Sequence, residues 1–183
     1  MAINRLTHNG YGQIELNQVA FRRDGRIEAQ CKLDPTITTY VENGMLLAVD
    51  KAGKKVGYPA NDGTDKLIGL HYSAEHQYDE RLVGLKDWKL DQGTFYPRIG
   101  FLATGDRFTT NTIQYNTSTY ATESALKTAI SGAATTAVYG GISTTGCIEI
   151  LAAAPSYGPK LQVVGPDTMP DGQYAVKFVV LDA

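Results

Sequence analysis

Apolar side chains recur mostly at every second position along the chain, which is the period of a β-strand with one buried face. The clearest example covers residues 27–33, where Ile, Ala, Cys and Leu alternate with Glu, Gln and Lys. Asp24-Gly25 comes just before it, and this dipeptide is typical of a type I′ hairpin, whose two central residues need positive φ. The pattern therefore predicts a β-hairpin over residues 19–33.

Residues 41–72 predict three strands joined by two turns. Residues 45–49 are continuously apolar, which indicates a strand that is buried on both faces or that changes sheets. The turn at residues 50–53 ends in Gly53, which suits a left-handed backbone. A short return strand and a second turn around Asp62-Gly63 follow, and residues 67–72 predict the third strand.

One helix is predicted, over residues 123–131. Thr122 is a suitable N-cap and Gly132 a suitable C-cap. The apolar stripe that would face the core consists of Ala125, Leu126, Ala129 and Ile130. Near the end of the sequence, residues 174–181 alternate strongly and predict a long strand.

These elements predict a mainly β protein whose antiparallel core is a small barrel or sandwich. The chain has 183 residues, 43% of them hydrophobic, which suffices for one domain with its own core. Residues 1–13 are polar, with Gly10 and Gly12 around Tyr11, and predict a flexible, extended N-terminal arm. Residues 14–183 would then form a single β-rich domain, with a sub-lobe boundary near 116–122 as a further option.

Charge and cysteine content argue against several classes of function. The net charge is −2 and no run of Lys or Arg exceeds two residues, so a basic face for nucleic acid is not expected. Cys31 and Cys147 are too far apart for a zinc knuckle or a CxxC pair, and a disulfide between them stays open. The first residues lack the apolar segment of a signal peptide, and no apolar run approaches the ~20 residues of a membrane helix. We therefore expect a protein made in a cytoplasm, with neither nucleic acid nor membrane as partner.

No known catalytic motif has the right spacing in this sequence. His71, Glu75 and His76 read H-x-x-x-E-H, whereas zinc proteases place two histidines one helical turn apart. The aspartates gather near turns, which turn propensity explains, although a distant pair of carboxylates could still serve a glycosidase. We expect no catalytic, cofactor-binding or metal-binding residue and no enzyme activity.

The eleven tyrosines outnumber the five phenylalanines. Tyrosine suits protein interfaces, because its ring is apolar and its hydroxyl stays hydrated. Packing at the rim of a β-barrel explains the same composition, so both interpretations stay open.

The order of strands and turns in residues 41–72 resembles the head decoration proteins, or capsid cement proteins, of tailed bacteriophages, especially the lambda type with its β-tulip fold. The resemblance is carried by an apolar strand, an Asp, a Lys/Gly turn, a short strand, an Asp-Gly-Thr turn and a Gly-containing apolar strand. These features are Gly44 with residues 45–49, Asp50, Gly53-Lys54, Val56, Asp62-Gly63-Thr64 and residues 67–70. The final TMPDGQYAVKFVVLDA is also similar to phage virion proteins. The chain is longer than the lambda-type proteins, and residues 116–132 have no counterpart in them.

The resemblance implies a structural virion protein that binds the outside of the mature capsid and stabilises the junctions between capsomers. Its partner would be the major capsid protein, and a trimer would be its oligomer. By the same resemblance the N-terminal arm would order against the capsid, with Arg5 and Tyr11 as contacts, and Arg22 and Arg23 are further candidates. Deletion of residues 2–12 would then abolish capsid binding and leave the domain folded. Alternative functions are a tail or head–tail component, or a carbohydrate-binding β module.

Overall fold

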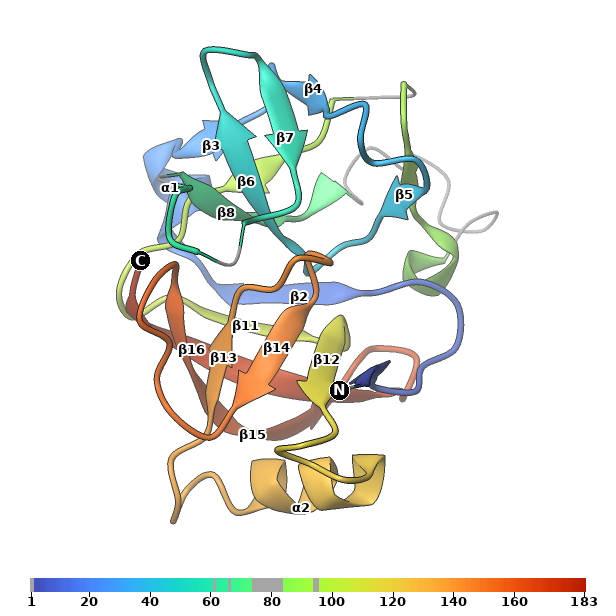
Figure 1. Cartoon of the computed structure of the whole chain (residues 1–183), viewed down its shortest axis with the longest axis vertical. Coiled ribbons are helices and arrows are strands. Elements are labelled where there is room, and N and C mark those ends of the chain that lie inside the picture. Colours follow the sequence, from blue (N-terminus) through green and yellow to red (C-terminus); the bar gives the residue numbers. More distant parts are fainter. Residues whose placement is uncertain (1, 61, 66, 74–83, 94–95) are drawn as a thin grey trace.

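The computed structural model describes residues 2–60, 62–65, 67–73, 84–93 and 96–183. Its strands form three sheets, accompanied by two α-helices. The mainly β class predicted from the sequence is therefore confirmed. Figure 1 shows the two larger sheets one above the other, with helix α2 (Glu123–Ser131) beneath the lower sheet.

The larger sheet has eight strands in the order β1-β12-β14-β13-β15-β16-β11-β2. Its strands are antiparallel, apart from the parallel pair β12–β14. In chain order the strands are β1 (Ile3–Arg5), β2 (Ile14–Gln18), β11 (Arg107–Thr110), β12 (Ile113–Asn116), β13 (Tyr139–Gly141), β14 (Ile148–Leu151), β15 (Lys160–Thr168) and β16 (Tyr174–Asp182). Among the described residues β1 and β2 do not pair with each other, so this sheet is open and does not form the expected barrel.

The second sheet has six short strands in the order β3-β10-β8-β6-β7-β4. In chain order they are β3 (Ile27–Glu28), β4 (Lys32–Leu33), β6 (Leu46–Asp50), β7 (Lys55–Gly57), β8 (Ile68–His71) and β10 (Ile99–Gly100). A separate pair joins β5 (Tyr40–Val41) to β9 (Leu90–Asp91), close after the 3₁₀ helix η2 (Leu85–Asp87).

Strand β6 packs on both of its faces, as its continuous apolar sequence predicts. Leu46 belongs to the main core, which also contains buried side chains of the eight-stranded sheet. Leu47 and Val49 belong to a second core, which includes Trp88 and Leu90. Because neighbouring residues of a strand point in opposite directions, β6 connects the two cores.

Helix α2 agrees closely with its prediction. The Thr122 hydroxyl accepts a hydrogen bond from the Ala125 amide at 3.2 Å, which satisfies a free donor at the helix N-terminus. Leu126 and Ile130 are fully buried, and the helix packs against β15. The prediction succeeds here because the N-cap and the apolar stripe both depend on residues that are close together in the sequence.

The predicted hairpin at residues 19–33 is wrong. Residues 20–24 instead form the short helix α1 (Ala20–Asp24), which Gly25 ends with a left-handed φ of 69°. Phe21 is fully buried, and its ring lies so close to Gly100 that a Cβ there would overlap it. Strands β3 and β4 pair with β10 and β7, and not with each other. The free energy gained by burying the Phe21 side chain thus outweighs the local preference of Asp24-Gly25 for a hairpin turn.

The N-terminal segment is also not a free arm. Strand β1 pairs with β12, and the next residue, Leu6, is 1% exposed. A Cβ at Gly12 would overlap Thr112 Oγ1, and Gly10 has a φ of 76° where its Cα faces the Lys86 carbonyl. These two glycines therefore permit close packing rather than flexibility. Deletion of residues 2–12 would remove part of the fold itself.

Candidate functional site

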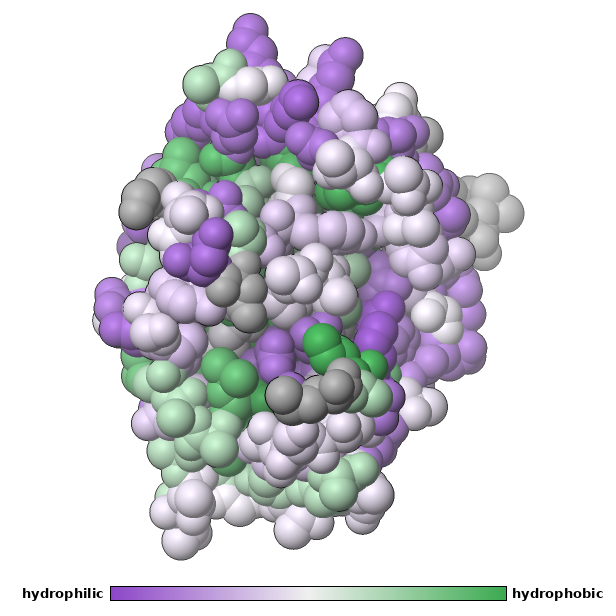
Figure 2. Space-filling view, viewed as in Figure 1, coloured by the Kyte–Doolittle hydropathy of each residue, from purple (hydrophilic) through white to green (hydrophobic). Residues whose placement is uncertain are grey.

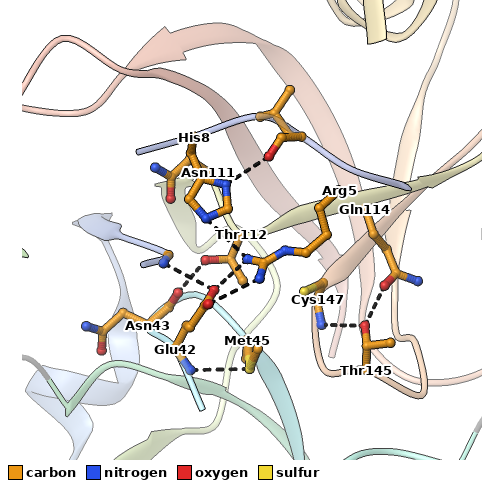
Figure 3. A network of polar contacts seen from close by, with 12 residues as sticks. Arg5, His8, Glu42, Asn43, Met45, Asn111, Thr112, Gln114, Thr145 and Cys147 are labelled. Atoms are coloured by element: carbon orange, nitrogen blue, oxygen red, sulfur yellow. Dashed lines mark hydrogen bonds and ion pairs between the residues drawn. The ribbon is translucent and has the colours of Figure 1, made fainter. Parts of the chain in front are cut away.

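Buried polar side chains gather where the loop before β6 meets the eight-stranded sheet. We call this group the polar joint; it consists of Arg5, Gln13, Glu42, Asn43, His71, Ser73, Thr110, Asn111 and Thr112. Figure 3 shows Arg5 reaching from the N-terminal segment to Glu42, beside Asn43 and Thr112. Every member except Arg5 is at most 1% exposed, so their polar groups depend on partners within the protein rather than on solvent.

Glu42 is the buried charge at the centre of the polar joint. Its Oε1 accepts from Arg5 Nη1 at 3.1 Å, and its Oε2 accepts from Arg5 Nη2 at 2.5 Å. The amide of Gly12 also donates to Oε2, at 3.1 Å. Burial alone would lower the pKa of Arg5, but the hydrogen bond to Glu42 and the attraction of nearby negative groups together outweigh it and raise that pKa. Two parallel bonds from a guanidinium are the strongest arrangement for a carboxylate.

Threonine hydroxyls connect the loop before β6 to the start of β12. Thr112 Oγ1 donates to the Asn43 carbonyl at 2.5 Å, and Thr110 Oγ1 donates to the Gln13 carbonyl at 2.6 Å. Asn111 Oδ1 in turn accepts from the Gln13 amide at 2.7 Å. Backbone groups of two distant segments, at Gln13 and Asn43, are therefore hydrogen-bonded to side chains of residues 110–112, which fixes these segments relative to each other.

His71 and Ser73 form a pair that resembles the base and nucleophile of a hydrolase. His71 Nδ1 donates to the Glu42 carbonyl at 2.7 Å, so its Nε2 accepts from Ser73 Oγ at 2.8 Å. Ser73 Oγ also accepts from the Arg98 amide at 2.7 Å. Both side chains are fully buried, so the pair bonds three segments together and presents no nucleophile to a substrate.

His71 begins the H-x-x-x-E-H group, and it is fully buried at the end of β8. Glu75 and His76 lie outside the described residues. In the part of the chain that the structure describes, no three His, Cys, Asp or Glu side chains gather in a way that could hold a metal ion.

Both cysteines are free thiols in buried positions. Burial raises the pKa of Cys147, which lies near the polar joint in Figure 3. Burial and the nearby Glu28 raise the pKa of Cys31. A protonated buried thiol is a poor nucleophile, so neither cysteine is suited to catalysis.

Two aspartates confirm the turn explanation of their positions. Asp34 Oδ1 accepts from the amide and hydroxyl of Thr36, and Asp62 Oδ1 accepts from the same groups of Thr64. These hydrogen bonds lower the pKa of both carboxyl groups. Each carboxylate therefore stabilises its own turn.

The four predicted contact residues lie in two separate places. Arg5 is bound to Glu42, and Tyr11 packs edge-on against Tyr40 with ring centres 5.1 Å apart. Arg22 and Arg23 are exposed on α1, where Arg23 pairs with Asp24 at 2.8 Å. Figure 1 places α1 and β1 on different sides of the molecule. The polar joint was not anticipated from the sequence, because its partners are distant in the chain.

Comparison of the chain with protein-family models, with curated proteins and with solved structures gave no match in any of the three. Within the described residues, no helix combines the length and the apolar character that a membrane crossing would need.

Proposed function

We propose that the protein is a structural protein of a tailed-phage virion, which binds the outside of the mature capsid and stabilises the junctions between capsomers. It acts through its surface, as a rigid β body held against the major capsid protein. Each bound copy would stabilise the expanded shell by mass action, because it binds that state and not its precursor.

The observation that carries the proposal is that side chains of the types used in catalysis are buried within the fold. Glu42, His71 and Cys147 are the kinds of side chain that enzymes use, yet all three are buried, and the side chains of Glu42 and His71 are hydrogen-bonded to other segments. Such a network stabilises one arrangement of the two sheets. A rigid body suits a binding partner, since little order is lost on association.

The resemblance in residues 41–72 gives the proposal its partner. The predicted order of strands and turns is present as β6, β7 and β8, with β6 between the other two. The residues that carry the resemblance therefore lie on adjacent strands of one sheet. This arrangement supports a likeness in local structure, and the capsid role rests on the family resemblance.

The contact surface proposed for the capsid centres on α1. Arg22 and Arg23 project from this helix with exposed side chains. Arg5 and Tyr11, by contrast, are engaged within the protein, so we assign them a role in holding the N-terminal segment. Trimer formation remains part of the proposal and can be measured by light scattering.

The test is co-sedimentation of the purified protein with capsids assembled from the major capsid protein of the phage that encodes it. We expect binding to expanded capsids and not to procapsids. Arg22→Glu combined with Arg23→Glu should weaken binding, because it reverses charge on α1. Lys160→Glu combined with Lys177→Glu reverses equal charge on β15 and β16, and should leave binding unchanged. Absence of binding to expanded capsids would overturn the proposal.

A further inference from the structure

A cavity of about 720 Å³ opens beside the β6–β7 turn of the six-stranded sheet. Four lysines line it: Lys32 from β4, and Lys51, Lys54 and Lys55 from the turn and the start of β7. Glu28 is the one carboxylate among its described lining residues. We call this cavity the lysine pocket. Figure 2 shows hydrophilic side chains gathered at the top of the molecule, where Figure 1 places the β6–β7 turn.

The lysines of the pocket differ from the other described lysines in their partners. Each described lysine outside it forms an ion pair with a carboxylate, namely Lys86, Lys89, Lys127, Lys160 and Lys177. Within the pocket, Lys55 pairs with Asp34 at 3.6 Å. Lys32, Lys51 and Lys54 form no ion pair with any residue that the structure describes. Three lysines without an ion-pair partner among the described residues thus line one cavity of a chain whose net charge is −2.

The backbone around the pocket is fixed in a costly conformation. Lys54 has a φ of 52°, and it is the one non-glycine residue with positive φ among those described. A left-handed conformation was predicted for the neighbouring Gly53, which does not adopt it. The Gly53 amide donates to Asp50 Oδ1 at 2.9 Å. The Lys54 carbonyl accepts from the Lys32 amide at 3.0 Å. A residue with a Cβ rarely adopts this conformation, and the bond to Lys32 holds Lys32 and Lys54 beside the same cavity.

Apolar and aromatic groups form another part of the lining. Leu33 and Pro35 contribute from β4 and the loop after it, and Tyr96 contributes from the segment before β10. The Tyr96 ring is 46% exposed, and Lys32 Nζ lies 6.0 Å from its centre. The pocket therefore offers cations together with an aromatic surface, which suits a ligand with carboxylates and short apolar stems.

We propose that the lysine pocket binds an acidic peptide segment of a partner protein, whose carboxylates pair with Lys32, Lys51 and Lys54. Single-stranded nucleic acid fits less well, because its backbone needs cations spaced along a groove. The lysines of the pocket line a single cavity. No described arginine lines the pocket to hold a phosphate by two parallel bonds. The inference does not depend on the proposed capsid function, since it uses only the lining of the cavity.

The test is fluorescence anisotropy with a labelled hexaglutamate peptide that carries a terminal tyrosine. Binding should be saturable and should weaken as sodium chloride is raised, because salt screens exposed charges. The variant with Lys32→Gln, Lys51→Gln and Lys54→Gln should bind at least about tenfold more weakly. The matched control, Lys86→Gln with Lys127→Gln and Lys160→Gln, removes the same charge elsewhere and should bind as the original protein does.

Three results would overturn the assignment. One is equal loss of binding in the two triple variants, which would mean that only overall charge matters. A second is tighter binding of an oligothymidylate, or of inorganic polyphosphate, than of the peptide. The third is no peptide binding by the original protein. Replacement of the three lysines by arginine keeps the charge and should retain binding, which separates loss of charge from damage to the fold.

Discussion

Arg5 donates two hydrogen bonds to the carboxylate of Glu42 across 37 residues of the chain, and Glu42 is only 1% exposed. The pair attaches the N-terminal segment to the loop that precedes β6. Its importance follows from the burial of Glu42, because a buried carboxylate without a partner is strongly destabilising.

Replacement of Arg5 by Met should lower the free energy of unfolding by about 2 kcal/mol. A fully buried ion pair costs ~3–5 kcal/mol to break, and the value here is smaller because 37% of the Arg5 side chain is exposed. Urea unfolding of Arg5→Met, Glu42→Gln and the double variant measures the interaction. The double variant should recover part of the loss, because it leaves no unpaired charge.

Arg23→Met is the control for this cycle, since Arg23 pairs with its neighbour Asp24 in an exposed position. Its stability should equal that of the original protein within error. An Arg5→Met variant as stable as this control would show that the Arg5–Glu42 pair does not hold the N-terminal segment.

Much of the fold was predictable where the signal is local. Helix α2 begins at its predicted cap, and β6, β7, β8 and β16 lie in the predicted ranges. The prediction was wrong at residues 20–24, because the position of Phe21 depends on Gly100, which is distant in sequence. The polar joint and the lysine pocket could not be predicted from the sequence for the same reason, since each combines segments that only the folded chain brings together.

Gly12→Ala should destabilise the protein by ~1–3 kcal/mol, as overpacking of a tight contact does. A Cβ at this position would overlap Thr112 Oγ1 and would lie 2.8 Å from Glu42 Oε2. Thermal unfolding of the variant measures the effect. Gly165→Ala is the matched control, because a Cβ there meets no atom within 4 Å, and it should leave the midpoint unchanged or slightly raised. Equal midpoints for the two variants would contradict close packing at Gly12.

Acid should destabilise the protein as the pH falls below about 4, the ordinary pKa range of carboxyl groups. Burial alone would raise the pKa of Glu123, but hydrogen bonds from Lys127 and Thr7 outweigh it and lower the pKa. Hydrogen bonds from Thr36 lower the pKa of Asp34. A lowered folded-state pKa contributes stability above the unfolded pKa, and that stability is lost as the pH falls through the folded value.

Urea unfolding between neutral and acidic pH measures this loss. Thr7 donates to Glu123 Oε2 through both its amide and its hydroxyl, at 3.1 and 2.6 Å. Glu123→Gln should therefore lose less stability on acidification than the original protein does. An identical pH dependence in this variant would rule out Glu123 as a contributor.

The two cysteines should react slowly with Ellman's reagent in the folded protein. Reaction requires the thiolate, and burial raises the pKa of both thiols. Addition of guanidinium chloride should release two reactive thiols per chain, since both cysteines are free. Fast reaction without denaturant, or fewer than two thiols with it, would contradict the buried, unpaired state.

The position of β16 has a consequence for the order in which the protein can fold during synthesis. This strand lies between β15 and β11, so it alone connects the pair β11–β2 to the other five strands of the sheet. It is also translated after every other strand of that sheet. Both parts of the sheet are therefore synthesised before the strand that joins them. Their edge strands stay unpaired until residues 174–182 have also been made. Premature termination before Tyr174 should leave a product with two exposed strand edges, prone to aggregation rather than slightly less stable.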